Sequence, residues 1–128
     1  MLRAILKSKV HHAHVTQSNI HYEGSITIDP LIMKAADLVA FERVQISSLA
    51  TGTRLETYVI EGEKGTGIIG VNGAAAKLVK KNEIIHIMSY VWATDAECRK
   101  LKPRIVHLDA KNRVQKLTRG HIQPPANA

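Results

Sequence analysis

The stretch Ile84-Ile85-His86-Ile87-Met88-Ser89-Tyr90-Val91-Trp92 is the strongest strand signal in the sequence. It is rich in the β-branched and aromatic residues that favour extended backbone. Two residues later, Thr94 and Glu97 have the spacing of a capping box, which predicts the start of a short helix. We therefore expect strands to form the body of this protein, with small helices between them.

Short apolar runs separated by turn residues continue this pattern in both directions. They predict further strands at residues 2–15, 26–28, 44–49, 54–60, 68–71, 105–108 and 114–117. Thr51-Gly52 predicts a hairpin between the strands at 44–49 and 54–60. Many short strands with one or two small helices indicate a mainly β fold, built as a compact barrel or sandwich.

Helical signals are few and local. Asp29 followed by Pro30 predicts a helix start, because aspartate caps the first turn and proline fits its first position. This helix should present Leu31, Ala35 and Leu38 on its apolar side and end within residues 36–40. A second helical turn is expected to begin at Asn72. Beyond Gly120 we expect a poorly ordered tail.

The composition indicates one soluble domain spanning residues 1–128. Of the 128 residues, 45% are hydrophobic, which is enough for a core without cross-links. The single cysteine, Cys98, excludes a disulfide framework, and no segment has the length of a membrane span. Charged residues interrupt the first seven positions too early for a signal peptide. We therefore expect a cytoplasmic protein that does not enter a membrane.

The formal net charge of +7 is carried by the last part of the chain. Residues 76–128 hold eleven Lys and Arg against four Asp and Glu, whereas residues 26–75 hold four against six. Only 4% of residues are aromatic, so few side chains are available to stack on bases. This pattern predicts a basic surface, and it argues against a dedicated nucleic-acid-binding protein.

Seven histidines raise the question of a metal site. On an uninterrupted strand, His12 and His14 would share a face with Val10, whereas His11 would lie on the opposite face with Lys9 and Ala13. Two ligands do not complete a zinc site, and the other histidines lack ligand spacing. The sequence therefore predicts no metal.

The segment His21-Tyr22-Glu23-Gly24-Ser25 precedes a short apolar strand. A Gly-Ser pair is an ordinary turn by itself, but here it stands in a series of motifs. The sequence is similar from end to end to the pyruvoyl-dependent aspartate decarboxylase family. The matching stretches are Leu6-Lys7-Ser8-Lys9-Val10-His11, Val15-Thr16, His21-Tyr22-Glu23-Gly24-Ser25, Arg54 with Thr57-Tyr58, Glu63-Lys64-Gly65, and Val71-Asn72-Gly73-Ala74-Ala75-Ala76.

The resemblance implies a double-psi β-barrel with small flanking helices, assembled as a homotetramer with sites between subunits. It also implies self-cleavage between Gly24 and Ser25 into a β chain (1–24) and an α chain (25–128). Ser25 Oγ would attack the Gly24 carbonyl to give an ester. Elimination and hydrolysis would then release ammonia and leave a covalent pyruvoyl group at Ser25, without pyridoxal phosphate or a metal.

The implied reaction converts L-aspartate to β-alanine and CO2 through a Schiff base with this pyruvoyl group, in the pantothenate pathway. A bound ketone supplies the electron sink that decarboxylation needs. Ser25 and Tyr58 are the implied catalytic residues, with Tyr58 as proton donor. Thr57 is implied to assist cleavage by stabilising the oxyanion at Gly24.

Lys9 and Arg54 provide the two cations that a dicarboxylate substrate requires. Arg54 in particular can bind a carboxylate with two hydrogen bonds. The resemblance implies substrate contacts for Lys9, Tyr22, Arg54, Thr57, Asn72, Gly73, Ala74 and Ala75, with His11 lining the same pocket. Strand alternation would place Arg54 and Tyr58 on one face and Thr57 on the other. The site then requires a bent strand or residues shared between subunits, and the resemblance implies the second.

Some positions depart from the family pattern, and some questions stay open. Ser47 and His86 stand where relatives carry apolar residues, which affects the dimensions of the pocket; Lys77 and Asn82-Glu83 also differ. An alternative is a non-enzymatic basic β-barrel that binds nucleic acid or an acidic protein. A third possibility is a family member that stays an uncleaved, inactive precursor. Whether maturation needs a helper protein is not decided by the sequence.

Overall fold

A computed structural model describes residues 1–120 and confirms the mainly β prediction. In that range the strands are β1 (Leu2–His14), β2 (Gln17–Asn19), β3 (Ser25–Ile28), β4 (Arg43–Ser48), β5 (Arg54–Glu61), β6 (Ile69–Asn72), β7 (Ile84–Thr94), β8 (Arg104–Leu108) and β9 (Val114–Arg119). The helices are α1 (Pro30–Ala36), the 3-10 helix η1 (Gly73–Lys77) and α2 (Asp95–Lys100). The tail predicted after Gly120 lies outside the described residues.

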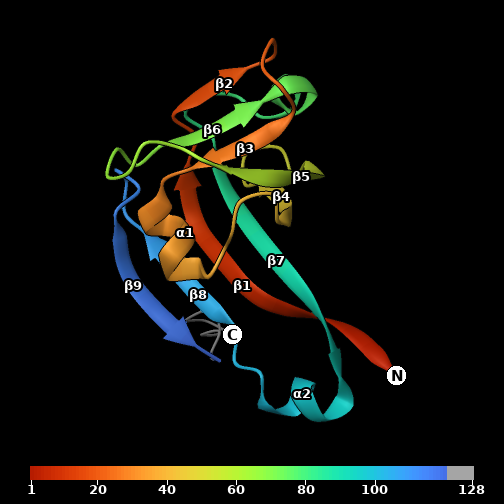
Figure 1. Cartoon of the computed structure of the whole chain (residues 1–128). Helices are drawn as coiled ribbons and strands as arrows, with labels where there is room; N and C mark the ends of the chain where they lie inside the picture. Colours follow the sequence, from red (N-terminus) through yellow and green to blue (C-terminus); the bar gives the residue numbers. More distant parts are fainter. Residues whose placement is uncertain (121–128) are drawn as a thin grey trace.

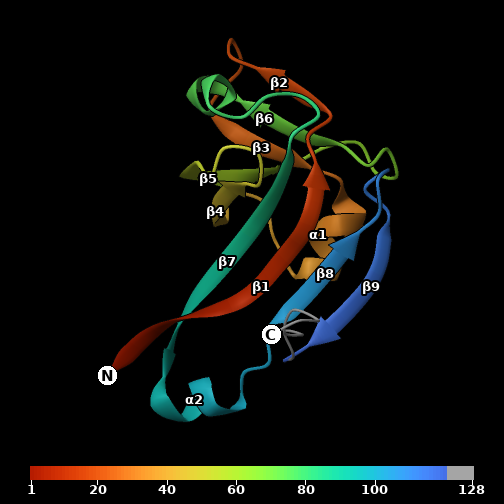
Figure 2. The ribbon, with the colours of Figure 1, turned by 180° about the vertical axis from the view of Figure 1, so that it is seen from behind.

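The strands form one mixed sheet in the order β2-β6-β3-β5-β4-β7-β1-β8-β9. Three pairs are parallel, namely β1 with β8, β2 with β6 and β3 with β5. In Figure 1 the long β1–β7 ribbon runs down the molecule, and β2, β6, β3 and β5 cross at its upper end. Figure 2 shows β8 and β9 beside β1 on the reverse side. This mixed, crossed arrangement agrees with the predicted double-psi β-barrel.

The core is aliphatic and lies where the crossed strands meet. All four residues of β3 and all four of β6 are buried, so this pair runs through the interior. The largest fully buried side chains are Val10, Val15, Ile26, Ile28, Ile32, Val44, Ile46, Val59, Ile69, Val71, Ile85 and Ile87. Burial of apolar surface on this scale is the main force that holds the fold together.

Helix α1 begins as predicted, with Asp29 as N-cap and Pro30 in the first turn. Asp29 also accepts hydrogen bonds from the backbone N–H groups of Gly65 (3.1 Å) and Gly67 (2.8 Å), so it fixes the loop before β6. Its burial opposes ionisation, but these backbone hydrogen bonds outweigh that effect and hold the pKa of Asp29 below its usual value. One carboxylate therefore organises a helix start and a loop.

The predicted apolar side of α1 is confirmed in part. Leu38 is buried and Ala35 packs against the core, but Leu31 is 43% exposed. The buried residues of the helix itself are Ile32, Met33 and Ala36. The helix is only seven residues long, and it ends at Asp37 in the left-handed conformation. In so short a helix, packing against β8 decides which residues are buried, and a periodic pattern has little weight.

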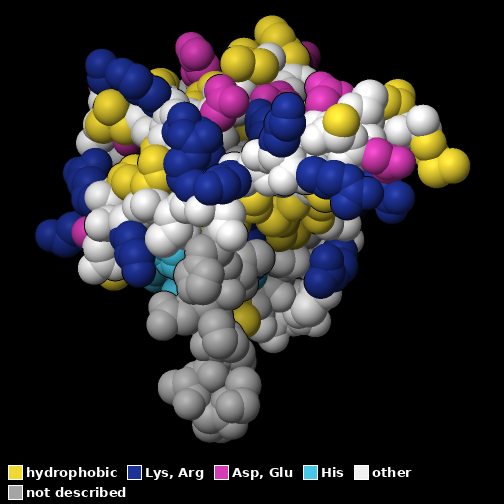
Figure 3. All heavy atoms as spheres, turned by 90° about the horizontal axis from the view of Figure 1, so that it is seen from below, with side chains coloured by type: hydrophobic (Ala, Val, Ile, Leu, Met, Phe, Trp, Pro, Cys, Tyr) yellow, Lys and Arg dark blue, Asp and Glu magenta, His cyan; other side chains and the backbone are white. Residues whose placement is uncertain are grey.

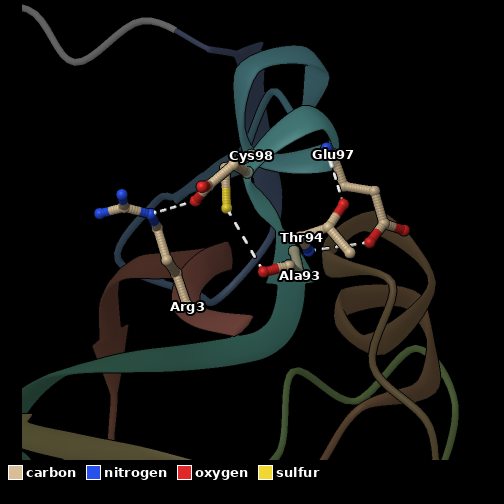
Figure 4. Close-up of polar contacts among 6 residues, drawn as sticks. Arg3, Ala93, Thr94, Glu97 and Cys98 are labelled. Carbon is tan, nitrogen blue, oxygen red and sulfur yellow. Dashed lines mark hydrogen bonds and ion pairs between the residues drawn. The ribbon is translucent and has the colours of Figure 1, made fainter. Parts of the chain in front are cut away.

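Helix α2 has the predicted capping box (Figure 4). The Thr94 side chain accepts from the backbone N–H of Glu97 (3.2 Å), and the Glu97 carboxylate accepts from the N–H of Thr94 (2.9 Å). The Cys98 thiol donates to the Ala93 carbonyl, which anchors the helix to the end of β7. Within residues 1–120, no helix has the length and hydrophobicity that crossing a membrane would require.

Strand β1 contains two register shifts against β7. The second is a β-bulge: Val10 pairs with Ile87 and Ala13 pairs with Ile85, so His11 and His12 together oppose the single residue His86. His12 has a φ of 62°, a left-handed conformation that is uncommon outside glycine. The bulge changes the side-chain alternation of the strand, so that Val10 and Ala13 are both buried.

Candidate functional site

Ser25 stands at the start of β3 and is 1% exposed. Its hydroxyl donates to the carbonyl of Glu23 (3.0 Å) and accepts from the side-chain amide of Asn72 (3.1 Å). Asn72, the last residue of β6, is directly opposite Ser25 in the antiparallel β3–β6 ladder. The hydroxyl at the predicted cleavage point is therefore held in one position by two partners.

Gly73 lies against the backbone that precedes Ser25. A methyl group on Gly73 would come within 2.5 Å of Gly24 Cα and 2.7 Å of Gly24 N, and its φ of 72° already favours glycine. The carbonyl of Tyr22 would also lie within 3.1 Å of that methyl group. Glycine is therefore required at position 73 for two reasons, its backbone conformation and its close approach to Gly24.

Strand β5 runs parallel to β3, with Ile26 paired with Val59 and Thr27 with Ile60. The pairing begins at Ile26 and Val59. Gly24 and Ser25 precede it on the β3 side, and Thr57 and Tyr58 precede it on β5. The ladder therefore brings the part of β5 that contains Thr57 and Tyr58 next to the start of β3.

The predicted alternation of β5 holds. Val59 is fully buried, whereas Arg54 and Glu56 are exposed and Tyr58 is half-buried. The partners of the outward residues in β4 are Ser47, Gln45 and Arg43, respectively, and Arg43 forms an ion pair with Glu56.

Lys9 and Arg54 lie at a distance from Ser25 within one chain. Lys9 is in β1, four strands from β3 in the order β3-β5-β4-β7-β1. At about 4.8 Å per strand, this is a path of about 19 Å along the sheet. Arg54 is four residues from Tyr58, which is about 13 Å along an extended strand. The chain thus brings together the residues around the cleavage point and leaves the two cations elsewhere on the sheet.

The other predicted site residues surround Ser25 more loosely. Tyr22 lies in the turn before β3 and is 55% exposed. Ala74 is exposed and Ala75 is half-buried, and both belong to η1 directly after Asn72. His11 is not in this group, because it lies in the β1 bulge.

Sequence reasoning missed Thr27, whose hydroxyl accepts a second hydrogen bond from the Asn72 amide (2.9 Å). Asn72 is 2% exposed, so Thr27 and Ser25 together satisfy a buried amide and fix its orientation. A signal for this was available, because Thr27 is two residues after Ser25 and must share its strand face.

The face assignment of the histidines is wrong. His11 and His12 are stacked, with ring centroids 4.0 Å apart, and His11 also stacks on His86 at 4.6 Å. The bulge is the physical reason, because it places two consecutive residues of β1 over one residue of β7. Burial and the neighbouring His12 lower the pKa of His11 to about 4; burial and Lys9 lower the pKa of His86 to about 4.

The predicted basic surface includes a hollow of about 510 Å³ where β1, α2 and the start of β8 approach one another. Its lining residues are Lys7, Asp37, Lys100, Leu101, Lys102, Arg104 and Arg119. Figure 3 shows Lys and Arg side chains spread over the face seen from below, with hydrophobic and acidic side chains between them. The cations on this face do not form an uninterrupted stripe.

Comparison with known proteins places the chain in a family. The family model described as aspartate decarboxylase matches residues 1–115. The chain is 53% identical to aspartate 1-decarboxylase of Corynebacterium efficiens over 114 residues, which are 89% of this chain and 84% of that relative. These likenesses favour the enzymatic interpretation over a basic binding module. The chain belongs to the aspartate decarboxylase family.

Proposed function

We propose that this protein is a carbon–carbon lyase that converts L-aspartate to β-alanine and CO2, using a pyruvoyl group that it makes from Ser25. The observation that carries the proposal is the environment of Ser25. The hydroxyl is buried, is held by Asn72 and Glu23, and follows a glycine that Gly73 packs against. Family membership adds the reaction class.

Self-cleavage would begin with attack of Ser25 Oγ on the Gly24 carbonyl carbon. The Oγ–C bond forms, the Gly24–Ser25 C–N bond breaks, and the serine nitrogen takes up a proton, which leaves an ester. The hydrogen bond from Asn72 supports a role for this residue in positioning the attacking oxygen. We assign to Thr57 the donor to the developing oxyanion, and its position on β5, two residues before the β3–β5 pairing begins, supports that assignment. One such donor contributes about 3–4 kcal/mol to a charged transition state.

The surroundings of Ser25 fit a pyruvoyl group, because that group is no larger than the serine it replaces. Gly24 and Gly73 leave the approach free of side chains, and the Asn72 amide offers a hydrogen-bond donor. The group would supply an electron sink for decarboxylation. Tyr58, which directly precedes the β5 residue paired with Ile26, is the proposed proton donor to the α-carbon after CO2 leaves.

Substrate binding requires cations for two carboxylates, and we assign this role to Lys9 and Arg54. Because both lie far from Ser25 along one sheet, we infer that neighbouring copies complete each site, as a homotetramer would allow. Large exposed aromatic side chains support assembly: Phe41 is 75% exposed, Trp92 73% and Tyr90 47%. Tyr22, Asn72 and the backbone of residues 73–75 would border the substrate.

We further infer a single domain over residues 1–128 that acts in the cytoplasm. The half-buried free thiol of Cys98 suits a reducing compartment. Cleavage by the chain's own groups is the proposed route of maturation, and a helper protein would act by accelerating it.

The test compares Ser25→Ala with Ser8→Ala, which removes a hydroxyl from an equally buried position in another strand. Each purified protein is incubated with carboxyl-labelled L-aspartate, and released CO2 and β-alanine are measured. We expect activity from the parent protein and Ser8→Ala, and none from Ser25→Ala. CO2 release by Ser25→Ala at the parental rate would overturn the proposal.

A further inference from the structure

The bulge in β1 gathers three imidazoles from two strands. His11 and His12 stand opposite His86, and the three side chains offer ligand nitrogens that all lie within 4.8 Å of one another. All three residues are half-buried, so solvent can reach the cluster while neighbouring strands fix the backbone on which it stands. The ring centroids of His12 and His86 are 5.3 Å apart, which completes a triangle with the two shorter stacking distances.

Neighbouring strands fix this arrangement from both sides. His11 pairs in register with His107 of β8, and their rings meet edge to face at 5.4 Å. His86 pairs with Ser47 of β4, which in turn pairs with Arg54. The imidazoles therefore lie on three adjacent strands, β8, β1 and β7. The same row continues through Ser47 of β4 to Arg54 of β5, a proposed substrate-binding residue.

Imidazole is the preferred ligand of zinc, copper and nickel, and three imidazoles form a common zinc ligand set. A metal ion binds the neutral imidazole ring through a nitrogen lone pair, and His11, His12 and His86 each offer one such nitrogen. The positive charge of Lys9 nearby opposes a bound cation, and the metal–nitrogen bonds must exceed that repulsion.

A modest rearrangement would complete the geometry. Zinc–nitrogen bonds of about 2.0–2.1 Å in a tetrahedral site place ligand nitrogens about 3.4 Å apart, so the rings must rotate closer together. The backbone N–H of His12 donates to Nδ1 of His86 (3.2 Å). Binding through either nitrogen of a neutral His86 ring removes Nδ1 as an acceptor, so this hydrogen bond must break when the metal binds.

We propose that His11, His12 and His86 bind one divalent transition-metal ion per chain, of the zinc, nickel or copper class, with water as the fourth ligand. The cluster lies beside Lys9, which we assign to substrate binding, but the proposed decarboxylation does not use this ion. Metal binding is therefore measured directly, without CO2 release as the readout.

The experiment uses the untagged full-length protein after treatment with a chelator. Co²⁺ is added stepwise, and the visible absorption typical of a four-coordinate cobalt site is followed; Zn²⁺ is then added to displace it. We expect saturation at one ion per chain, complete displacement by Zn²⁺, and faster hydrogen exchange at the His12 amide. Mg²⁺, which prefers oxygen ligands, should produce none of these changes.

Two variants remove one ligand each from different strands, His12→Asn and His86→Leu. Asparagine tolerates the left-handed backbone at position 12, so the first variant should keep the bulge. Removing a residue that only hydrogen-bonds to a metal ligand typically weakens metal affinity by about 10–100-fold. Removing a ligand itself should weaken it more, by over about 100-fold. His14→Asn, a matched change two residues away on the same strand, should bind as the parent does.

Three results would overturn the proposal. The first is failure of Co²⁺ and Zn²⁺ to saturate one site per chain. The second is unchanged affinity in both His12→Asn and His86→Leu. The third is an equal loss in His14→Asn, which would place the binding elsewhere. Because His86→Leu leaves the β1 backbone sequence intact, it keeps the test valid even if His12→Asn fails to fold.

Discussion

At the scale of single residues, the peptide between Gly24 and Ser25 is defined by what surrounds it. The side-chain amide of Asn72 donates one hydrogen bond to Ser25 and another to Thr27. The bond to Thr27 fixes the orientation of the amide that faces the serine oxygen. Gly73 brings its backbone close to Gly24, where any side chain would collide. Position and access at this peptide are therefore set by neighbours on β6 and η1, so a change there should affect cleavage.

Gly73→Ala should slow self-cleavage by about 100-fold. The added methyl group must push the Gly24 backbone away from its present position. Displacement of reacting groups by about 1 Å reduces a rate by about this factor. Gly52→Ala is the matched control. Its φ of 73° is nearly the same, but its added methyl group would have no neighbour within 4 Å. Conversion of precursor to two fragments is followed on denaturing gels. Equal rates in the two variants would remove Gly73 from the cleavage site.

At the scale of elements, the sequence predicted what depends on local chemistry. The Asp29-Pro30 helix start, the Thr94–Glu97 capping box and the hairpin at Thr51-Gly52 are each determined by a few adjacent residues, and all are confirmed. The bulge at His11 and His12 could not be predicted, because an extra residue in a strand is decided by its pairing with β7. The error in histidine faces followed directly from that bulge.

The candidate site, like the bulge, depends on strand pairing that local sequence does not determine. Gly24, Ser25, Thr57, Tyr58 and Asn72 were found through a resemblance in motifs, since no periodicity marks them. Their proximity comes from the β3–β5 and β3–β6 ladders, which join segments more than 30 residues apart in sequence. Pairing of distant strands depends on the packing of the whole chain, so sequence patterns alone could not supply it.

Asp29 links α1 to the loop before β6, and its loss should reduce stability. Asp29→Asn keeps one acceptor oxygen but turns an NH₂ group toward a backbone N–H, which should lower the free energy of unfolding at pH 7 by about 1–3 kcal/mol. Asp37→Asn is the control on the same helix, because asparagine tolerates its left-handed conformation. Denaturant unfolding at equal protein concentrations measures both.

The stability difference between the parent protein and Asp29→Asn should depend on pH. Because the folded pKa of Asp29 is lowered, its carboxylate contributes stability above its unfolded pKa of about 3.9, and this contribution is lost as pH falls toward the folded pKa. The difference between the parent and Asp29→Asn should therefore be largest near neutral pH and shrink below about pH 4. A difference that grows in acid would contradict the assignment.

At the scale of the whole molecule, the net charge of +7 proved to be a surface property spread among other side chains. The more informative surface lies over β4 and β7, where β7 exposes Tyr90 and Trp92. A hollow of about 360 Å³ lies there, lined by Ala4, Glu42, Arg43, Val44, Gln45, Glu56, Tyr90, Val91 and Trp92. Large exposed aromatic side chains beside such a hollow are typical of association surfaces.

Trp92→Glu should therefore convert the proposed tetramer to smaller species, because a charge would be buried in an apolar contact without a partner. Val114→Glu, which places the same charge on β9, should leave the assembly unchanged. Light scattering coupled to size-exclusion chromatography measures the mass in solution. If Trp92→Glu keeps the parental mass, the aromatic surface is not part of the assembly.

The central claim is that Ser25 becomes the carbonyl group through which this enzyme acts, and the most direct test is intact-protein mass spectrometry. After maturation, the account predicts two chains that meet between Gly24 and Ser25. The larger chain should be lighter by one ammonia than simple hydrolysis would leave it. A single intact chain with an unmodified Ser25 in a preparation that releases CO2 from L-aspartate would contradict the claim.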